Sequence, residues 1–267
     1  MRRVIVKFTG ILLLLAIVTA STGCGASKET EVKNIWIMGD SLAADRGTGD
    51  IKIYRNVAVG WGCMLDEYLK TDTVIRNVAA SGASSLNYLD NMVYQMALDN
   101  MEEGDYVLIQ FGHNDSYWED RATDPYGSSE DEGSFKNILK YKYIEPIIEK
   151  GAHPILITSV VGSYYDAFGN LYMMHYYAHA QAMRELVEEC KREKMDVDLI
   201  DAYAITEEYY NEIGEEKAKE YHTDDTHYNG YGAIYAAGII AEKMQELGVP
   251  CCKDIRTEEE VLKMFEN

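Results

Sequence analysis

The run Tyr106-Val107-Leu108-Ile109-Gln110-Phe111 is the stretch of this sequence that most clearly decides the fold. It is apolar at nearly every position and too short for a helix, which is typical of a strand buried on both faces of a parallel sheet. The polar turn Gly112-His113-Asn114-Asp115 follows it at once. We therefore predict a central strand over residues 106–111 whose carboxyl end opens into a polar loop.

Similar short apolar runs alternate with helical patterns on both sides of this strand. They predict four further strands, at residues 34–38, 73–78, 154–161 and 197–200. Apolar residues at helical spacing predict helices between them, over 61–69, 86–98, 135–150 (kinked at Pro146), 183–190 and 234–244. Strands separated by helices form a parallel sheet with helices on both faces, so we expect an α/β fold of three layers with five strands. No linker divides the chain, and we expect one domain over residues 34–250 followed by a C-terminal extension over 251–267.

Composition narrows the class of protein. Hydrophobic residues make up 47% and charged residues 26%, as in ordinary globular proteins. The chain has 25 basic and 45 acidic residues, a net charge of −20, which argues against nucleic acid as a partner because phosphate binding needs clustered Lys and Arg. Tyrosine outnumbers phenylalanine 21 to 5, which predicts exposed aromatic surface with polar ends.

The first 23 residues have the layout of a secretory signal. A basic start with Arg2, Arg3 and Lys7 precedes an apolar stretch, and small residues then lead to Cys24. The run Ser21-Thr22-Gly23-Cys24 resembles a bacterial lipobox, which implies acylation of Cys24 and a hydrophilic tether over residues 24–33. We expect an exported bacterial lipoprotein held to the membrane through Cys24, with plain secretion or an uncleaved anchor as alternatives.

Four polar or glycine-containing clusters fall at the predicted strand ends or before the last helix. Each alone also suits an ordinary turn or helix cap. Parallel strands end at one edge of a sheet, where ligands bind, so the four clusters are expected to converge there. They are Gly39-Asp40-Ser41-Leu42, Ala79-Ala80-Ser81-Gly82-Ala83-Ser84, Gly112-His113-Asn114-Asp115 and Thr223-Asp224-Asp225-Thr226-His227.

The residue types in these clusters suit acyl transfer. Ser41 is a candidate nucleophile, His227 its base, and Asp224 the carboxylate that orients the imidazole, since a serine hydroxyl needs a base to take its proton. An oxyanion needs hydrogen-bond donors, and the backbone N–H groups of Ser41 and Gly82 with the Asn114 amide would supply three.

Other chemistries have weaker support, and we expect neither a cofactor nor a catalytic metal. His175 and His179 have a metal-ligand spacing but lack the Glu of a His-Glu-x-x-His motif. His222 and the Asp224–His227 cluster contain residue types that can bind zinc, but a zinc site leaves Ser41 and Asn114 unexplained. No dinucleotide-binding glycine pattern follows the first strand. The pairing of Cys63, Cys190, Cys251 and Cys252 is not determined by the sequence; they suit small buried positions.

The four clusters resemble the four motif blocks of the SGNH, or GDSL, hydrolases, and the resemblance runs from about Ile35 to Leu247. It implies a flavodoxin-like α/β/α fold and esterase activity, with the roles given above for Ser41, Gly82, Asn114, Asp224 and His227. Within that superfamily the chain looks most like the rhamnogalacturonan acetylesterases. The stretches behind this finer resemblance are Gln110-Phe111-Gly112-His113-Asn114-Asp115, Gly60-Trp61-Gly62, Asp225-Thr226-His227 and Ala182-Met183-Arg184-Glu185-Leu186.

The segments 115–134 and 162–174 do not match this pattern, so we expect substrate choice to depend on them. Their aromatic residues include Trp118, Tyr164 and Tyr165, candidates for stacking on sugar rings, although such rings also pack under their own loops. The sequence thus predicts a serine esterase that removes O-acetyl groups from an extracellular poly- or oligosaccharide of the pectin type (rhamnogalacturonan) or a related plant polysaccharide. Two alternatives stay open: an esterase for lipid or peptidoglycan acetyl esters, and a noncatalytic, lipid-anchored glycan-binding protein.

Overall fold

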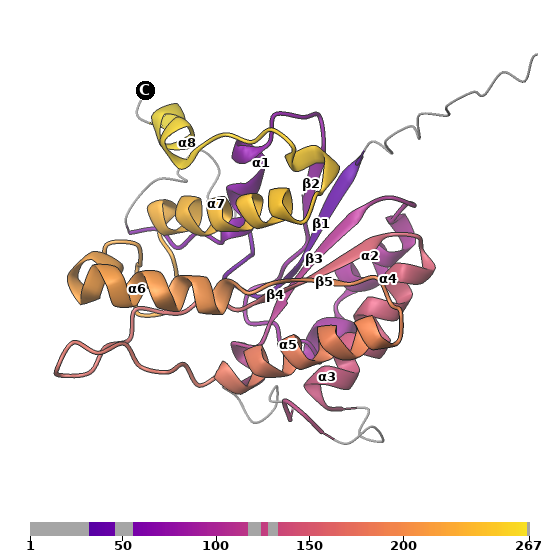
Figure 1. The fold of residues 1–267 in the computed structure, drawn as a ribbon, viewed down its shortest axis with the longest axis horizontal. Helices are drawn as coiled ribbons and strands as arrows, with labels where there is room; N and C mark the ends of the chain where they lie inside the picture. Colours follow the sequence, from indigo (N-terminus) through magenta and orange to yellow (C-terminus); the bar gives the residue numbers. More distant parts are fainter. Residues whose placement is uncertain (1–31, 46–55, 117–123, 128–132, 266–267) are drawn as a thin grey trace, which may run out of the picture.

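The computed structural model of the protein describes residues 32–45, 56–116, 124–127 and 133–265. Its centre is a sheet of five parallel strands in the order β2-β1-β3-β4-β5, which is the flavodoxin-like order (Figure 1). The predicted fold class is confirmed. The strands are β1 Asn34–Gly39, β2 Val74–Asn77, β3 Tyr106–Phe111, β4 His153–Thr158 and β5 Asp198–Ile200.

Helices cover both faces of the sheet because alternate strand residues point to opposite sides. In β1, Ile35 and Ile37 join one apolar core, whereas Trp36 and Met38 join the other. The first core packs against α1 Leu65–Tyr68, α6 Ala202–Lys219, α7 Gly230–Glu246 and α8 Glu258–Phe265. The second packs against α2 Met92–Asn100, α3 Phe135–Ile138, α4 Glu145–Glu149 and α5 Tyr177–Arg192.

Three predicted helices are present but interrupted. The first is a 3₁₀ turn, Trp61–Cys63, followed by α1, and the second is a 3₁₀ turn, Asn87–Asp90, followed by α2. Asn91 lies between the 3₁₀ turn Asn87–Asp90 and α2 and leaves the helical conformation. Its side chain accepts from the N–H of Val93 at 3.2 Å and so caps α2.

The third predicted helix, over residues 135–150, contains a π-helical stretch, Leu139–Ile144, directly before α4. Pro146 lies in the first turn of α4. A proline has no N–H to donate and its ring crowds the preceding turn, and a wider π turn accommodates both. The irregularity predicted at Pro146 therefore takes this form, just before the proline.

Strand β4 is shorter than predicted. It ends at Thr158, and residues 159–161 leave the sheet although they are buried. The N–H of Val161 donates to Oγ1 of Thr206 at 3.0 Å, so a side chain takes the place of a neighbouring strand.

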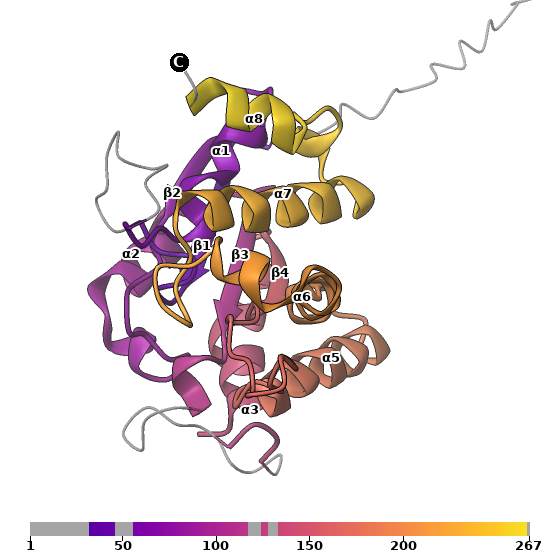
Figure 2. The ribbon, with the colours of Figure 1, turned by 90° about the vertical axis from the view of Figure 1, so that its left-hand side faces the viewer.

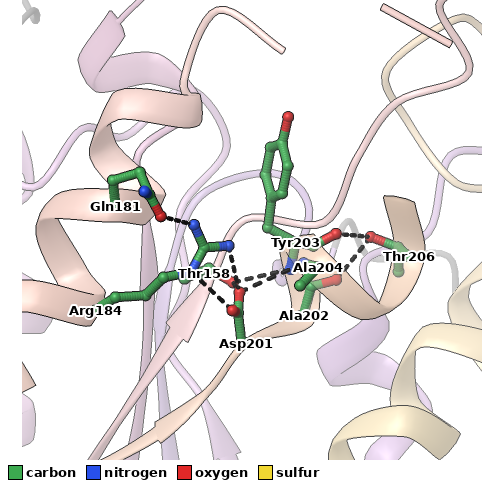
Figure 3. A network of polar contacts seen from close by, with 8 residues as sticks. All are labelled: Thr158, Gln181, Arg184, Asp201, Ala202, Tyr203, Ala204 and Thr206. Carbon is green, nitrogen blue, oxygen red and sulfur yellow. Dashed lines mark hydrogen bonds and ion pairs between the residues drawn. The ribbon is translucent and has the colours of Figure 1, made fainter. Parts of the chain in front are cut away.

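A polar network fixes the place where β4, β5, α5 and α6 meet (Figure 3). Arg184 of α5 donates to both carboxylate oxygens of Asp201, at 2.7 and 2.9 Å, and also contacts Gln181. Thr158 donates to Asp201 at 2.9 Å and accepts from the N–H of Tyr203 at 2.8 Å. Arg184 belongs to one of the motif stretches singled out in the sequence, and its observed contacts fix the start of α6.

The segment after Cys252 packs against the rest of the molecule. Ile255 forms an antiparallel bridge with Leu69, and Arg256 donates to the carbonyls of Glu67 and Leu69 at 2.9 and 2.5 Å. Val261 of α8 is fully buried. The residues expected as a C-terminal extension therefore contribute to the apolar core beside α1 and α7.

The expectation that tyrosines form exposed aromatic surface holds only in part: Tyr126, Tyr141 and Tyr172 are exposed, but many others are not. Seven tyrosines are among the largest fully buried side chains, and several donate their hydroxyl to a backbone carbonyl, as Tyr68 does to Ile234 at 2.8 Å and Tyr176 to Val160 at 2.6 Å. A phenol can be buried when its hydroxyl finds an acceptor. The seven are Tyr68, Tyr88, Tyr143, Tyr176, Tyr203, Tyr210 and Tyr228.

Cys63, Cys190, Cys251 and Cys252 are all buried, and none of these four described cysteines forms a disulfide. Cys24 and the segment 1–23 lie outside the described residues. Among the helices that are described, none is long and apolar enough to cross a membrane.

Candidate active site

Ser41 lies in a tight turn at the carboxyl end of β1. The carbonyl of Asp40 accepts from the N–H groups of Ala43 and Ala44, and the Asp40 carboxylate accepts from the N–H of Leu42 at 2.9 Å. Gly39 is required before this turn, because a Cβ there would lie 2.7 Å from the carbonyl oxygen of Gln110. The turn thus holds Ser41 at the strand end, where its side chain is almost buried.

Gln110 supports this turn from β3, a role that the sequence analysis did not identify. Its amide nitrogen donates to Asp40 at 3.1 Å and to Ser159 at 3.2 Å, and its amide oxygen accepts from the indole of Trp61 at 3.0 Å. A polar residue inside an apolar strand was the available signal, since a buried amide needs partners.

Ser41, His227 and Asp224 form a continuous hydrogen-bonded series. Ser41 Oγ lies 3.1 Å from His227 Nε2, and His227 Nδ1 lies 2.9 Å from Asp224 Oδ2. Partial burial acts to raise the pKa of Asp224, but hydrogen bonds from the side chain and backbone of His227 and from Thr226 hold it below its ordinary value. The carboxylate is therefore charged at neutral pH, as an imidazole partner in acyl transfer requires.

The loop that carries Asp224 and His227 is closed on itself. His222 and Tyr228 form an antiparallel bridge at its base, and the N–H of Thr223 donates to the carbonyl of His227 at 2.8 Å. Inside the loop, Asp224 Oδ1 accepts from the N–H groups of Thr226 and His227 at 2.8 and 2.7 Å. These bonds orient the carboxylate as well as the imidazole.

A second loop, after β4, braces the first. The N–H of Ser163 donates to the carbonyl of Asp225 at 2.8 Å, and the hydroxyls of Tyr164 and Thr226 are hydrogen-bonded. Gly162 allows this approach, since a Cβ there would lie 2.4 Å from the carbonyl oxygen of Asp225.

Tyr164 and Tyr165 are half-buried, and both hydroxyls are hydrogen-bonded within the molecule. The phenol of Tyr164 contacts Thr226, and that of Tyr165 donates to the carbonyl of Tyr210 at 3.0 Å. Trp118, the third aromatic candidate for substrate binding, lies outside the described residues.

The loops after β1, β2 and β3 are tied together around the Gly82 and Asn114 positions. The N–H of Ala80 donates to the carbonyl of Gly39 at 2.9 Å, and the Asn114 amide donates to the carbonyl of Ala83 at 2.8 Å. Gly82 has a φ of +77°, a left-handed conformation that suits glycine. The structure thus places Asn114 directly against the loop that contains Gly82.

Asp115 is a further support that the sequence analysis quoted without giving it a role. One of its carboxylate oxygens accepts from the N–H and hydroxyl of Ser85, at 3.0 and 2.5 Å, and the other from the N–H of Gly112 at 3.0 Å. This fully buried carboxylate joins the loop after β2 to the turn after β3, beside Asn114.

Three further histidines, His113, His175 and His179, make ring contacts. The rings of His113 and His175 contact at 5.1 Å, and His179 packs against Phe135 at 4.8 Å. Burial and then the nearby His175 and His227 lower the pKa of His113 to about 3, so its ring is neutral. Among the described residues, no three His, Cys, Asp or Glu side chains gather where they could hold a metal ion.

Comparison with known proteins gives the same picture. The GDSL-like lipase/acylhydrolase family matches residues 35–240. Rhamnogalacturonan acetylesterase RhgT of Bacillus subtilis is 31% identical over 225 residues, 78% of this chain and 90% of the relative. Rhamnogalacturonan acetylesterase of Emericella nidulans is 24% identical over 232 residues, 81% of this chain and 86% of that protein.

A solved structure shares the fold. The Bacillus subtilis protein YXIM superposes with a TM-score of 0.67 at 23% identity, over 83% of this chain and 58% of that protein, so the chain spans little more than half of it. The family match covers most of the strands and all four motif blocks. The chain belongs to the GDSL-like lipase/acylhydrolase family, as its four motif blocks predict.

Proposed function

We propose that this protein is a serine esterase that removes O-acetyl groups from a carbohydrate. The observation that carries the proposal is the hydrogen-bonded series from Ser41 through His227 to Asp224 at the carboxyl edge of the sheet. Its relatives named rhamnogalacturonan acetylesterase support acetyl esters as the substrate class.

The proposed reaction has two steps. Ser41 Oγ attacks the acetyl carbonyl carbon while His227 Nε2 takes the hydroxyl proton, and Asp224 stabilises the imidazolium that results. The backbone N–H groups of Ser41 and Gly82 and the Asn114 amide stabilise the oxyanion. The C–O bond to the sugar breaks, and the sugar oxygen takes the proton from His227. Water then attacks the acetyl-serine by the same route and releases acetate.

For the polysaccharide, we propose rhamnogalacturonan first and an acetylated neutral glycan such as xylan second. The names of the relatives favour the first. The net charge of −20 favours the second, because it opposes long-range attraction of an anionic pectin. Acetate release from a panel of acetylated polysaccharides, with the Ser41→Ala protein as blank, decides between them.

The same measurement tests the alternatives. Release of acetate from acetylated lipid or peptidoglycan but from no plant polysaccharide would show that the substrate is a lipid or peptidoglycan acetyl ester. A noncatalytic glycan-binding protein would leave p-nitrophenyl acetate intact. The assembled Ser41–His227 pair supports the catalytic reading.

We further propose that the protein is exported and anchored through a lipid on Cys24, facing the cell surface or periplasm. The proposal rests on the basic and apolar pattern of residues 1–23 and on the lipobox-like run that ends at Cys24. Metabolic labelling with a fatty acid should mark the wild-type protein, and Cys24→Ala should release it unlabelled. Labelling of the Cys24→Ala protein would contradict the anchor.

A further inference from the structure

The molecule has a cavity of about 410 Å³ that the proposed reaction does not use. It is lined by residues of α6, the start of α7 and α8. Figures 1 and 2 show α8, α7 and α6 one below another on the same side of the molecule. Small-molecule sites have volumes of about 300–1,000 Å³, so this one can hold a sugar ring. Its polar and aromatic lining consists of Tyr209, Tyr221, Tyr231, Lys217, Glu220 and Glu258.

Two of the tyrosines form part of a rigid aromatic wall. The rings of Tyr209 and Tyr221 both stack on Tyr235 of α7, with centroids 4.5 and 5.5 Å away and interplanar angles of 26° and 24°. Their hydroxyls lie 3.1 Å apart. Because the rings are already ordered by packing against one another, little side-chain entropy is lost when a ligand stacks on them.

Two charged residues of the lining, Glu258 and Lys217, have hydrogen-bonding capacity available to a ligand. Neither Glu258 nor Lys217 forms an ion pair within the part of the chain that the structure describes. Burial and then the nearby Glu242 carboxylate raise the pKa of Glu258. A half-buried carboxylate in such surroundings is stabilised by a ligand that donates hydrogen bonds to it.

We propose that this cavity binds a neutral sugar ring. Sugar hydroxyls both donate and accept, which suits the Glu258 carboxylate and the Lys217 ammonium group, while the C–H face of the ring suits the tyrosines. A uronate would be repelled by the carboxylates of the lining. A quaternary ammonium ligand has no N–H to donate to Glu258 and no acceptor for Lys217. The neutral ring is therefore the class that fits the whole lining.

This inference deepens the proposed function by giving the protein a second contact with its carbohydrate. Tyr221 directly precedes the His222–Tyr228 loop, and Tyr231 follows it, so the cavity adjoins the segment that carries Asp224 and His227. A polymer held there stays at high local concentration near the enzyme even when no acetyl group is bound. Only this link to the substrate rests on the proposed function; sugar binding itself does not require esterase activity.

The test is titration of the wild-type protein with unacetylated oligosaccharides, followed by calorimetry or NMR. Xylotetraose and galactotetraose are the neutral probes, tetragalacturonate is the anionic probe and choline is the cationic one. We expect at least one neutral probe to bind, and tetragalacturonate and choline to bind at least tenfold more weakly. Absence of binding by both neutral probes, or tighter binding of either charged probe, would overturn the proposal.

Variants assign the binding to the cavity. Tyr209→Ala removes one stacking face and should weaken the neutral probe about tenfold. Leu262→Trp should fill the cavity from α8 and abolish binding, which keeps the test informative if Tyr209→Ala unfolds. Tyr141→Ala, a partly exposed tyrosine on the opposite layer, is the matched control and should bind as wild type. Unchanged affinity in both cavity variants would overturn the assignment.

Glu258→Gln tests the charge argument. It keeps the size of the side chain but removes one negative charge, so the preference for neutral over anionic probe should narrow. An unchanged preference would overturn the role given to Glu258. Hydrolysis of p-nitrophenyl acetate by the wild-type protein is recorded separately, so a failure of the proposed esterase function is seen there and not in these titrations.

Discussion

The hydroxyl of Tyr210 in α6 lies 2.7 Å from Nε2 of His222, at the base of the loop that carries Asp224 and His227. The two rings also pack edge to face, with centroids 5.6 Å apart. Burial lowers the pKa of His222 to about 4, so the imidazole is neutral at physiological pH. The neutral Tyr210–His222 pair thus fixes the loop to α6. Protonation of the buried His222 destabilises this arrangement.

His222 should make the stability of the fold depend on pH. Its pKa is about 4 in the folded protein and roughly 6.5 in an unfolded chain, so the unfolded state binds more protons between these values. The neutral His222 contributes about 3 kcal/mol to the free energy of unfolding above pH 6.5, and this contribution is lost as the pH falls to 4. In His222→Gln, the free energy of unfolding should fall less steeply across this window.

Urea unfolding at pH 7, 5.5 and 4.5 measures this slope in both proteins. The slope is independent of any uniform loss of stability that the substitution causes. His113→Gln, at a second buried and neutral histidine near the site, is the companion variant and should remove a separate part of the pH dependence of stability. Equal slopes in wild type and His222→Gln would contradict the assignment.

Ser41→Ala should remove turnover without unfolding the protein. The Ser41 side chain makes one hydrogen bond, to His227, and its loss leaves the turn held by Asp40 and Gln110. We expect kcat on p-nitrophenyl acetate to fall by roughly 10⁴–10⁶, with the melting temperature nearly unchanged. Ser81→Ala, an exposed serine of the next loop, is the matched control. A Ser41→Ala protein that still releases acetate at near the wild-type rate would refute the serine mechanism.

Asn114→Ala should lower kcat by roughly 10²–10³, the loss typical of one oxyanion donor, and change KM less. The variant also leaves the carbonyl of Ala83 without its amide donor, at a cost of about 1–2 kcal/mol in stability. Asn100→Ala, in an exposed position at the end of α2, is the control for loss of an amide. A raised KM with unchanged kcat would instead make Asn114 a plain binding residue.

Much of the architecture follows from local patterns. The strands at residues 34–39 and 106–111 could be located because both are buried on two faces and therefore continuously apolar. The polar clusters after them could be assigned to one edge because parallel strands all end there. The same rule brings Ser41 and His227 together, although 186 positions separate them in the chain.

The parts that escaped prediction have physical reasons. Helix α6 buries Tyr203, Thr206 and Tyr210 instead of an aliphatic stripe, and Gly214 with a φ of +76° interrupts it. The supports of the site escaped for a related reason: Gln110, Asp115 and His222 are polar residues in buried positions. Their roles depend on hydrogen-bond partners distant in the chain, and periodicity carries no information on those partners.

The neighbours Asp224 and Asp225 should differ sharply in their effect on catalysis. Asp224 Oδ2 pairs with His227 Nδ1 at 2.9 Å while Oδ1 accepts two backbone N–H groups. Asp225 contributes its backbone carbonyl, which accepts from the N–H of Ser163, so a substitution of its side chain leaves that bond in place. Asp224→Asn replaces one of these oxygens by an NH₂ group, so either the loop bonds or the imidazole tautomer must change, and we expect kcat to fall by about 10⁴.

Asp225→Asn removes the same charge one position along the chain and should lower kcat only several-fold, which makes it the matched control. The measurement is kcat/KM for both variants on one ester at several ionic strengths, because a charge effect is screened by salt and a tautomer effect is not. A larger loss in Asp225→Asn than in Asp224→Asn would show that Asp224 is not the carboxylate that orients His227.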